Sequence, residues 1–267
     1  MRLLSFQIDE KSAFGALVEG RIVDLSIHMP EYGSLRELLA ARSLVRALDL
    51  AAEASADFNL NEVELLPPLT DPGKILCAVV ETNGTHIEQC FPIEGISLTG
   101  HRRPLSVTRP ASASTLTATA GIAIIIGTPG QNIPESEAQT HIAGLSLLNF
   151  IGSHAVADGG TNGMHYLSAG FGPWIVTTDE LDSLGPFGLT TSINETAEEY
   201  TVSGVARLVS RLSATEMLMP GDTIALLMAK PETPPAMESG DRLAVKVTEI
   251  GVLENTIADE TADSARA

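Results

Sequence analysis

Short apolar runs, separated by Gly, Pro, Asn or Asp, recur along most of this chain. Runs of this length that are rich in Val, Ile and Leu are typical of buried strands. Two stretches instead predict helices. One begins near Pro134 with acidic residues in its first turn, and the other covers about residues 202–217, where apolar positions repeat at helical spacing. The strands are predicted at residues 75–80, 121–127, 142–151, 175–176, 189–193, 223–228 and 243–247.

The first part of the chain has a different pattern. Residues 14–18 and 22–25 predict a hairpin, because they are apolar runs joined by a turn that contains Gly. Ser34 and Glu37 have the spacing of a capping box at the start of a helix. Residues 44–52 continue an apolar pattern of helical period. This part is therefore predicted to be a small α/β unit.

A domain boundary is predicted where Pro67-Pro68 and Asp71-Pro72-Gly73 break regular structure. Many strands with few helices after this point indicate an α+β fold that is mostly β, with a mixed sheet arranged as a barrel or sandwich. The predicted organisation is an N-terminal unit over residues 1–68, a β domain over 69–257 and an acidic flexible tail over 258–267.

Charge narrows the classes of partner. The 267 residues include 34 Asp and Glu against 16 Lys and Arg, which gives a net charge of −18. Nucleic acids and anionic membranes are therefore disfavoured, since both are bound by clustered Lys and Arg. The expected partner is a small-molecule substrate.

Localisation is predicted from the cysteines, the length of the apolar runs and the N-terminal segment. Cys77 and Cys90 are too few for a disulfide framework or a zinc knuckle. No apolar run reaches the 18 residues that suggest a membrane span, and the N-terminus turns polar too early for a signal peptide. We expect a reduced, cytoplasmic protein.

Several short motifs follow one another in a recognisable order. Together they resemble the fumarylacetoacetate hydrolase family over about residues 2–257. The resemblance implies a small N-terminal α/β unit, a C-terminal mixed β-roll and a homodimer. The motifs are residues 14–25, Leu66-Pro67-Pro68, Pro72-Gly73-Lys74, Gly172-Pro173-Trp174, Pro220-Gly221-Asp222, and Gly240-Asp241 with the later Ile250-Gly251.

The resemblance also locates a metal site that this chain does not complete. Members of the family usually hold Mg²⁺ or Mn²⁺ with an Asp-Tyr-Glu-x-Glu strand and a later Asn-Asp pair. The corresponding positions here are Thr119 and Gly121 for the two glutamates, and Phe150, after Asn149, for the aspartate. Hard cations need oxygen ligands such as carboxylates. We therefore expect no metal and no cofactor.

Other polar residues fall where the family keeps its pocket. A histidine can transfer a proton near neutral pH, and an arginine can hold an anion with two hydrogen bonds. The predicted catalytic residues are His86 and His154, with Glu81 and Asp158 to orient or charge them. The predicted substrate-binding residues are Arg109, Phe150, Tyr166 and Met228. An alternative for Tyr166 is packing under Trp174.

Two functions remain open at this point. The first is a metal-independent cyclase, isomerase or C–C lyase of specialised, polyketide-like metabolism, acting on an enolisable carbonyl or β-dicarbonyl. The second is a non-catalytic paralogue that binds a ligand or serves as the partner subunit of an active enzyme. An open apolar pocket that holds His86 and His154 favours the enzyme, whereas a pocket filled by Phe150 favours the paralogue.

Overall fold

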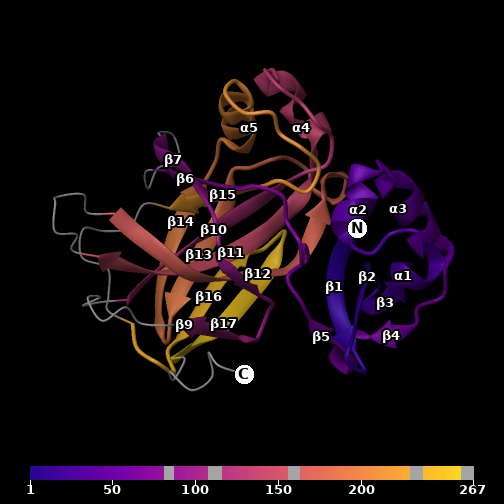
Figure 1. Ribbon diagram of the computed structural model, residues 1–267, viewed down its shortest axis with the longest axis horizontal. Helices are drawn as coiled ribbons and strands as arrows, with labels where there is room; N and C mark the ends of the chain where they lie inside the picture. Colours follow the sequence, from indigo (N-terminus) through magenta and orange to yellow (C-terminus); the bar gives the residue numbers. More distant parts are fainter. Residues whose placement is uncertain (81–86, 108–115, 156–162, 229–236, 260–267) are drawn as a thin grey trace.

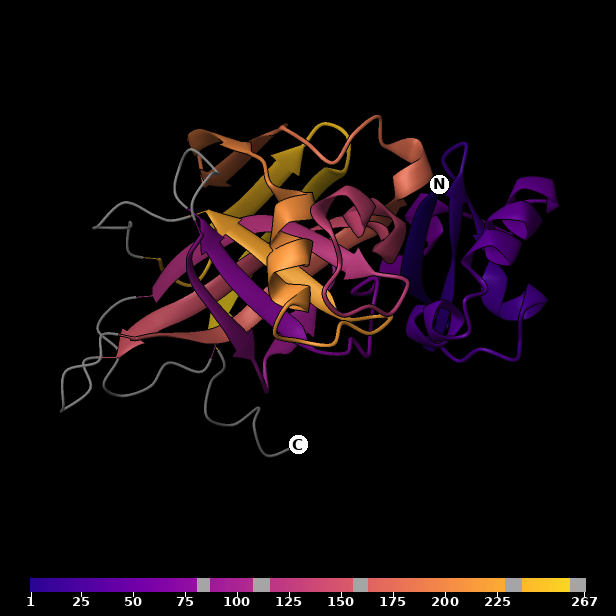
Figure 2. The same cartoon turned by 90° about the horizontal axis from the view of Figure 1, so that it is seen from above.

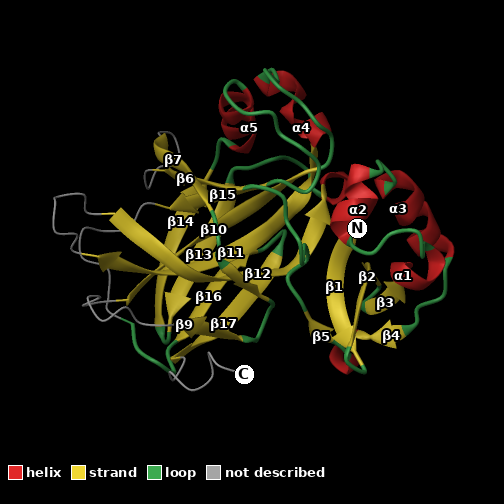
Figure 3. Ribbon diagram, viewed as in Figure 1, coloured by secondary structure: helices red, strands yellow, loops and turns green. Residues whose placement is uncertain are grey.

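The structure is a computed structural model that describes residues 1–80, 87–107, 116–155, 163–228 and 237–259, with backbone alone at 80, 87–90, 153–155 and 163–165. Strands dominate it, and helices lie mainly in the N-terminal unit and at one side of the β domain (Figure 3). The predicted α+β, mostly β fold is confirmed. In the described ranges no helix is long and apolar enough to cross a membrane.

The N-terminal unit lies at one end of the molecule (Figures 1 and 2). The predicted hairpin is present, and a strand that the sequence did not predict, β1, lies beside it. Ser34 caps α2 by accepting a hydrogen bond from the Glu37 N–H, at 3.3 Å. The Glu37 carboxylate accepts instead from the Gly33 N–H, so the predicted capping box is only half formed. The elements are β1 (Arg2–Ile8), β2 (Lys11–Val18), β3 (Arg21–Asp24), α1 (Leu25–His28), α2 (Leu35–Ala40), α3 (Leu44–Glu53), β4 (Phe58–Asn59), η1 (Leu60–Glu62) and β5 (Glu64–Leu65).

The larger sheet runs from this unit into the β domain. Its described order is β4-β3-β2-β1-β12-β11-β10-β15-β6-β7, with β5 paired to β1 and β8 paired to β12. Because β7 leads into β8 and β8 pairs with β12, the strands from β6 round to β12 close into a roll. The strands of the roll are β6 (Ile75–Val80), β7 (Ile87–Ile93), β8 (Ser97–Thr99), β10 (Leu116–Ile126), β11 (Ile142–Ala155), β12 (Gly163–Thr177) and β15 (Thr223–Met228).

A second sheet packs against the outside of the roll, in the order β14-β13-β16-β17-β9. β17, the last described strand in the sequence, extends into residues that were predicted to belong to the tail, because Ala258 and Asp259 pair with Ser106 and Val107 of β9. Residues 260–267 lie outside the described residues. The strands are β9 (Pro104–Val107), β13 (Phe187–Ile193), β14 (Thr196–Val202), β16 (Arg242–Val247) and β17 (Gly251–Asp259).

The helices of the β domain are shorter than predicted. α5 (Val205–Ser213) follows Gly204, whose φ of 85° ends the extended backbone of β14. Val202 therefore belongs to β14, although the other apolar positions of the predicted stripe are buried in α5 as expected. The helix near Pro134 is a short pair, η2 (Glu135–Glu137) and α4 (Ala138–His141), and η3 (Thr178–Glu180) follows β12.

Strand β10 separates two apolar cores. Every residue of β10 is buried, as expected of a strand covered on both faces. Ala120, Ile122 and Ile124 pack toward the second sheet and α5. Ala123 and Ile125 face the inside of the roll, whose apolar cluster continues into the N-terminal unit. Alternate positions of one strand therefore belong to different environments.

The motifs that carry the family resemblance hold chain segments together. The Gly73 N–H donates to the Gly221 carbonyl at 3.0 Å, and the Lys74 N–H donates to buried Asp222 at 2.9 Å. A Cβ at Gly73 would lie 2.2 Å from that carboxylate, so glycine is required there. The Trp174 indole N–H donates to the Ile250 carbonyl at 2.7 Å. These motifs therefore specify the fold.

Candidate active site

Several strand ends meet at one edge of the roll. We call it the far edge, because the N-terminal unit pairs with the opposite end of β12, where Arg2 lies opposite Val176. Strands β6, β15 and β11 end here, and β7, β10 and β12 begin here. The pairs that define the far edge are Val80 with Met228, Leu227 with Gly121, Leu116 with Ser153, and His154 with Met164.

The residues predicted to act in catalysis adjoin this edge in the sequence: Glu81 and His86 fall between β6 and β7, and Asp158 falls between β11 and β12. Arg109, predicted to bind substrate, falls between β9 of the second sheet and β10. These four lie outside the described residues. His154 is part of β11, although only its backbone is described. In the sequence, the two histidines and two acids thus fall within or next to strands that end or begin at the far edge, whereas Arg109 follows β9 of the second sheet by two residues.

Aromatic side chains fill the inside of the roll near this edge. Phe150 is fully buried, and its ring centroid lies 5.1 Å from that of Tyr166. Tyr166 in turn stacks on Phe91 of β7, with centroids 5.9 Å apart and planes 17° apart. Such offset contacts add to the stability that burial provides. Phe150 and Tyr166, both predicted to bind substrate, are thus packed against each other.

Burial affects the chemistry of Tyr166. Burial raises the pKa of the Tyr166 phenol well above its usual value, and the nearby Cys77 thiol raises it further. The phenol therefore stays protonated at neutral pH. It can donate a hydrogen bond to a ligand oxygen, but it cannot act as a base there.

The positions that correspond to the metal ligands do not fit a divalent cation. Thr119 lies directly opposite Phe150, and its hydroxyl donates to the Met228 carbonyl at 3.2 Å. A Cβ at Gly121 would lie 2.0 Å from the Leu226 carbonyl oxygen, so no carboxylate fits on this backbone. The described residues contain no cluster of three or more His, Cys, Asp or Glu that could hold a metal.

Asn149, the first residue of the Asn-Phe pair, is used elsewhere. It is buried, and its amide donates to Asn255 of β17 at 3.3 Å, on the face of β11 away from Phe150. The Asn255 amide donates to the Gly100 and Arg103 carbonyls at 2.9 and 2.8 Å. Asn149 therefore joins the two sheets, a role that needs no metal.

Two predicted contacts differ from what the structure shows. Tyr166 does not pack under Trp174, because it belongs to the apolar cluster inside the roll. Trp174 packs instead with the core between the two sheets and with the cluster around Leu4 and Phe6. The Arg2 guanidinium lies over its ring, 5.5 Å from the centroid. The side chain of Met228 packs in the core between the two sheets, and Leu227 faces the inside of the roll. The reason is the alternation of side chains along β15.

Phe91 is the site residue that sequence reasoning missed. It lies in β7, opposite Cys77, and completes the aromatic contact with Tyr166. The signal was weak because Pro92 follows it, and a proline within an apolar run argues against a central strand. Here Pro92 is tolerated because β7 is at the end of the described strand order.

The comparison with known proteins agrees with this fold. The family model "Fumarylacetoacetate (FAA) hydrolase C-terminal" matches residues 78–258. The chain belongs to the fumarylacetoacetate hydrolase family. It is 25% identical over 254 residues to a maleylpyruvate hydrolase of Aquipseudomonas alcaligenes, which covers 84% of this chain and 85% of that protein.

Solved members of the family have the same architecture. A maleylpyruvate hydrolase from Sphingobium sp. SYK-6 superposes with a TM-score of 0.82 at 20% identity, covering 97% of this chain and all of that one. The same enzyme was solved with manganese(II) and pyruvate. A 5-carboxymethyl-2-hydroxymuconate delta-isomerase from Mycobacterium smegmatis gives 0.75 at 22% identity, covering 98% of this chain and all of that one. The relatives are thus named as hydrolases and isomerases, and one was solved with a metal.

Proposed function

We propose that this member of the fumarylacetoacetate hydrolase family is a metal-independent enzyme acting on an enolisable carbonyl or β-dicarbonyl compound. The reaction class is cyclisation, isomerisation or C–C cleavage in specialised, polyketide-like metabolism. The observation that carries the proposal is the replacement of the metal carboxylates by Thr119, Gly121 and Phe150, with no room for a side chain at Gly121. Enolisation here must be driven by protein groups.

The residues proposed to do so are the polar residues predicted from the sequence. His154 or His86 takes the proton from the carbon next to the substrate carbonyl, since a base with a pKa near neutrality suits that step. Asp158 or Glu81 orients that imidazole, and Arg109 stabilises the negative charge that develops on the enolate oxygen. Support comes from the sequence positions of the two histidines and the two acids, which fall within or next to strands that end or begin at the far edge.

Enolisation can be tested without knowing the substrate. We expect the purified protein to accelerate exchange of the acidic CH₂ protons of acetylpyruvate, a simple β-dicarbonyl, in D₂O, followed by NMR. The rate should survive EDTA. Replacement of the true base, His154→Ala or His86→Ala, should lower the rate about 10²- to 10⁴-fold.

The controls distinguish loss of the catalytic base from loss of the folded structure. Each variant is checked by circular dichroism and thermal unfolding, and Glu199→Gln on the exposed strand β14 serves as a matched surface change. Exchange that needs added Mg²⁺ or Mn²⁺ would contradict metal independence. Normal rates in both histidine variants would remove the assignment of the base.

A specific observation favours a second candidate function, the non-catalytic paralogue. Phe150 is fully buried in aromatic contact, as expected if it fills the former metal site. In that case the protein would accelerate no exchange, and it would co-purify with an active relative of the same family. Size-exclusion chromatography with mass spectrometry of the native complex would identify that partner subunit.

A further inference from the structure

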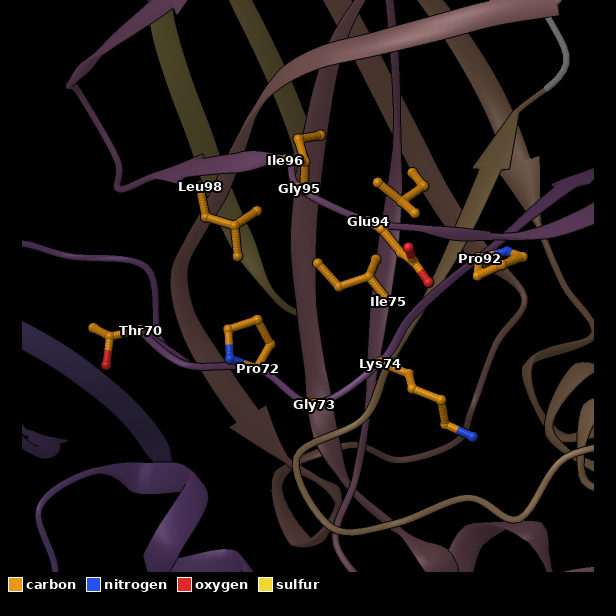
Figure 4. A pocket seen from close by; sticks show the side chains of 11 residues that line it. Thr70, Pro72, Gly73, Lys74, Ile75, Pro92, Glu94, Gly95, Ile96 and Leu98 are labelled. Atoms are coloured by element: carbon orange, nitrogen blue, oxygen red, sulfur yellow. The ribbon is translucent and has the colours of Figure 1, made fainter.

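A cavity of about 530 Å³ opens at the end of the roll opposite the far edge, where β6 begins and β7 leads into β8 (Figure 4). Ile75 and Ile93 lie directly opposite each other in its wall, and Leu98 of β8 lies opposite Ala169. The volume is within the range of small-molecule sites. The lining residues include Lys74, Ile75, Ile93, Glu94, Ile96 and Leu98.

The walls continue into the apolar inside of the roll. Along β6, Cys77 is the next position after Ile75 on the same face, and along β7 Phe91 is the corresponding neighbour of Ile93. Ile93, Ile96 and Leu98 all pack against the cluster inside the roll. A ligand in this cavity would therefore bury an apolar body against preformed walls.

At the mouth of the cavity, the charge left to bind a ligand is the negative charge of Glu94. The Lys74 ammonium is bound by the Glu216 carboxylate and by the Met217 carbonyl, each at 2.9 Å, and its side chain runs away from the cavity in Figure 4. Glu94 is exposed at the mouth, and it has no ion pair within the described part of the chain. The net charge of −18 also disfavours an anionic ligand.

We propose that this cavity binds a small organic cation with an apolar body, with the ammonium at Glu94 and the body against Ile75, Ile93 and Leu98. The site is separate from the far edge, so it goes beyond the function proposed above. A carboxylic acid would be repelled by the Glu94 carboxylate, and Lys74, the basic residue among the described residues of the lining, is already bound by Glu216. Acids are therefore excluded as ligands of this cavity.

Three probes of one shape test the proposal by isothermal titration calorimetry with the full chain: 4-phenylbutylamine, 4-phenylbutanol and 4-phenylbutyrate. We expect affinity to fall in that order, and the affinity for the amine to weaken with added salt. Glu94→Gln should lower the affinity for the amine about two- to fivefold, the range of an exposed ion pair, and leave the alcohol unchanged. Glu199→Gln, a second exposed carboxylate far along the chain, should change neither.

A substitution in the cavity wall shows whether the probes bind in this cavity or elsewhere on the protein. Ile96→Trp should fill the space and abolish binding of both the amine and the alcohol, while thermal unfolding reports whether the variant folds. The proposal is overturned if the acid binds as well as the amine, if Glu94→Gln leaves the affinity for the amine unchanged, if a folded Ile96→Trp variant still binds, or if the amine shows no binding.

Discussion

Gly121 shows how completely one residue can exclude a metal ligand. A Cβ at Gly121 would point at the backbone of β15, 2.0 Å from the Leu226 carbonyl oxygen and 2.9 Å from its carbon. β10 and β15 are paired at this point, with Gly121 opposite Leu227. Restoring a glutamate here would require the two strands to move apart. A glutamate side chain at position 121 is therefore incompatible with this spacing of the strands.

A pair of glycine variants tests how closely β10 and β15 approach each other at Gly121. Gly121→Ala should lower the free energy of unfolding by about 1–3 kcal/mol, because the added methyl overpacks a buried strand. Gly188→Ala is the matched control: Gly188 is also in a strand, but a Cβ there has nothing within 4 Å. Urea denaturation followed by circular dichroism measures both. Equal stability of the two variants would show that β10 and β15 separate easily.

Among the elements, the segment between β8 and β9 depends on one histidine. The Glu254 N–H of β17 donates to His101 Nδ1 at 3.1 Å, so this nitrogen must be unprotonated. The Arg102 N–H donates to the Glu254 carbonyl at 2.7 Å, which continues the connection. Protonation of the imidazole would break the first bond. The Glu254 carboxylate, an acidic group that opposes the effect of Arg102 on the imidazole, is shared with Arg102 and Arg242.

The structure therefore predicts a pH dependence of stability. Burial lowers the pKa of His101 below its usual value, the Arg102 charge lowers it further, and Glu254 opposes them. Because the unfolded chain then binds the proton more readily, stability should fall as the pH drops below about 6.5. The free energy of unfolding from urea titrations between pH 7.5 and 5 checks this. His101→Gln should flatten the decline, and an unchanged slope would contradict the role.

The elements also show how far sequence reasoning reaches. The strands β6, β10, β11, β13, β15 and β16 were predictable, because they are Val-, Ile- or Leu-rich runs, whereas β1, β7, β8, β9, β14 and β17 were not predicted. The replacements at Thr119, Gly121 and Phe150 are also visible in the printed sequence. The face of each side chain was not predictable. After Thr223, β15 is apolar on both faces, so no polar alternation shows that Leu227 points into the roll and Met228 away from it.

At the scale of the whole molecule, the family resemblance predicts a homodimer. We expect light scattering at micromolar concentration to give about twice the 28.1 kDa of the chain. Self-association of a chain with a net charge of −18 is opposed by repulsion, so the dimer should be favoured by added salt. A mass of one chain at all concentrations would contradict the expectation.

The pairing of β1 with β12 has a consequence for how the protein is made. Arg2 lies opposite Val176, so the N-terminal unit shares its sheet with a strand that is synthesised much later. At about 5–20 residues per second, the ribosome needs roughly 9–35 s to reach that partner. β5 covers the same edge of β1 at Phe6 and Gln7, so the part left unpaired until then is the short stretch at Arg2 and Leu3. The N-terminal unit can therefore form its own hairpin and helices early, but it joins the larger sheet only after β12 has been made.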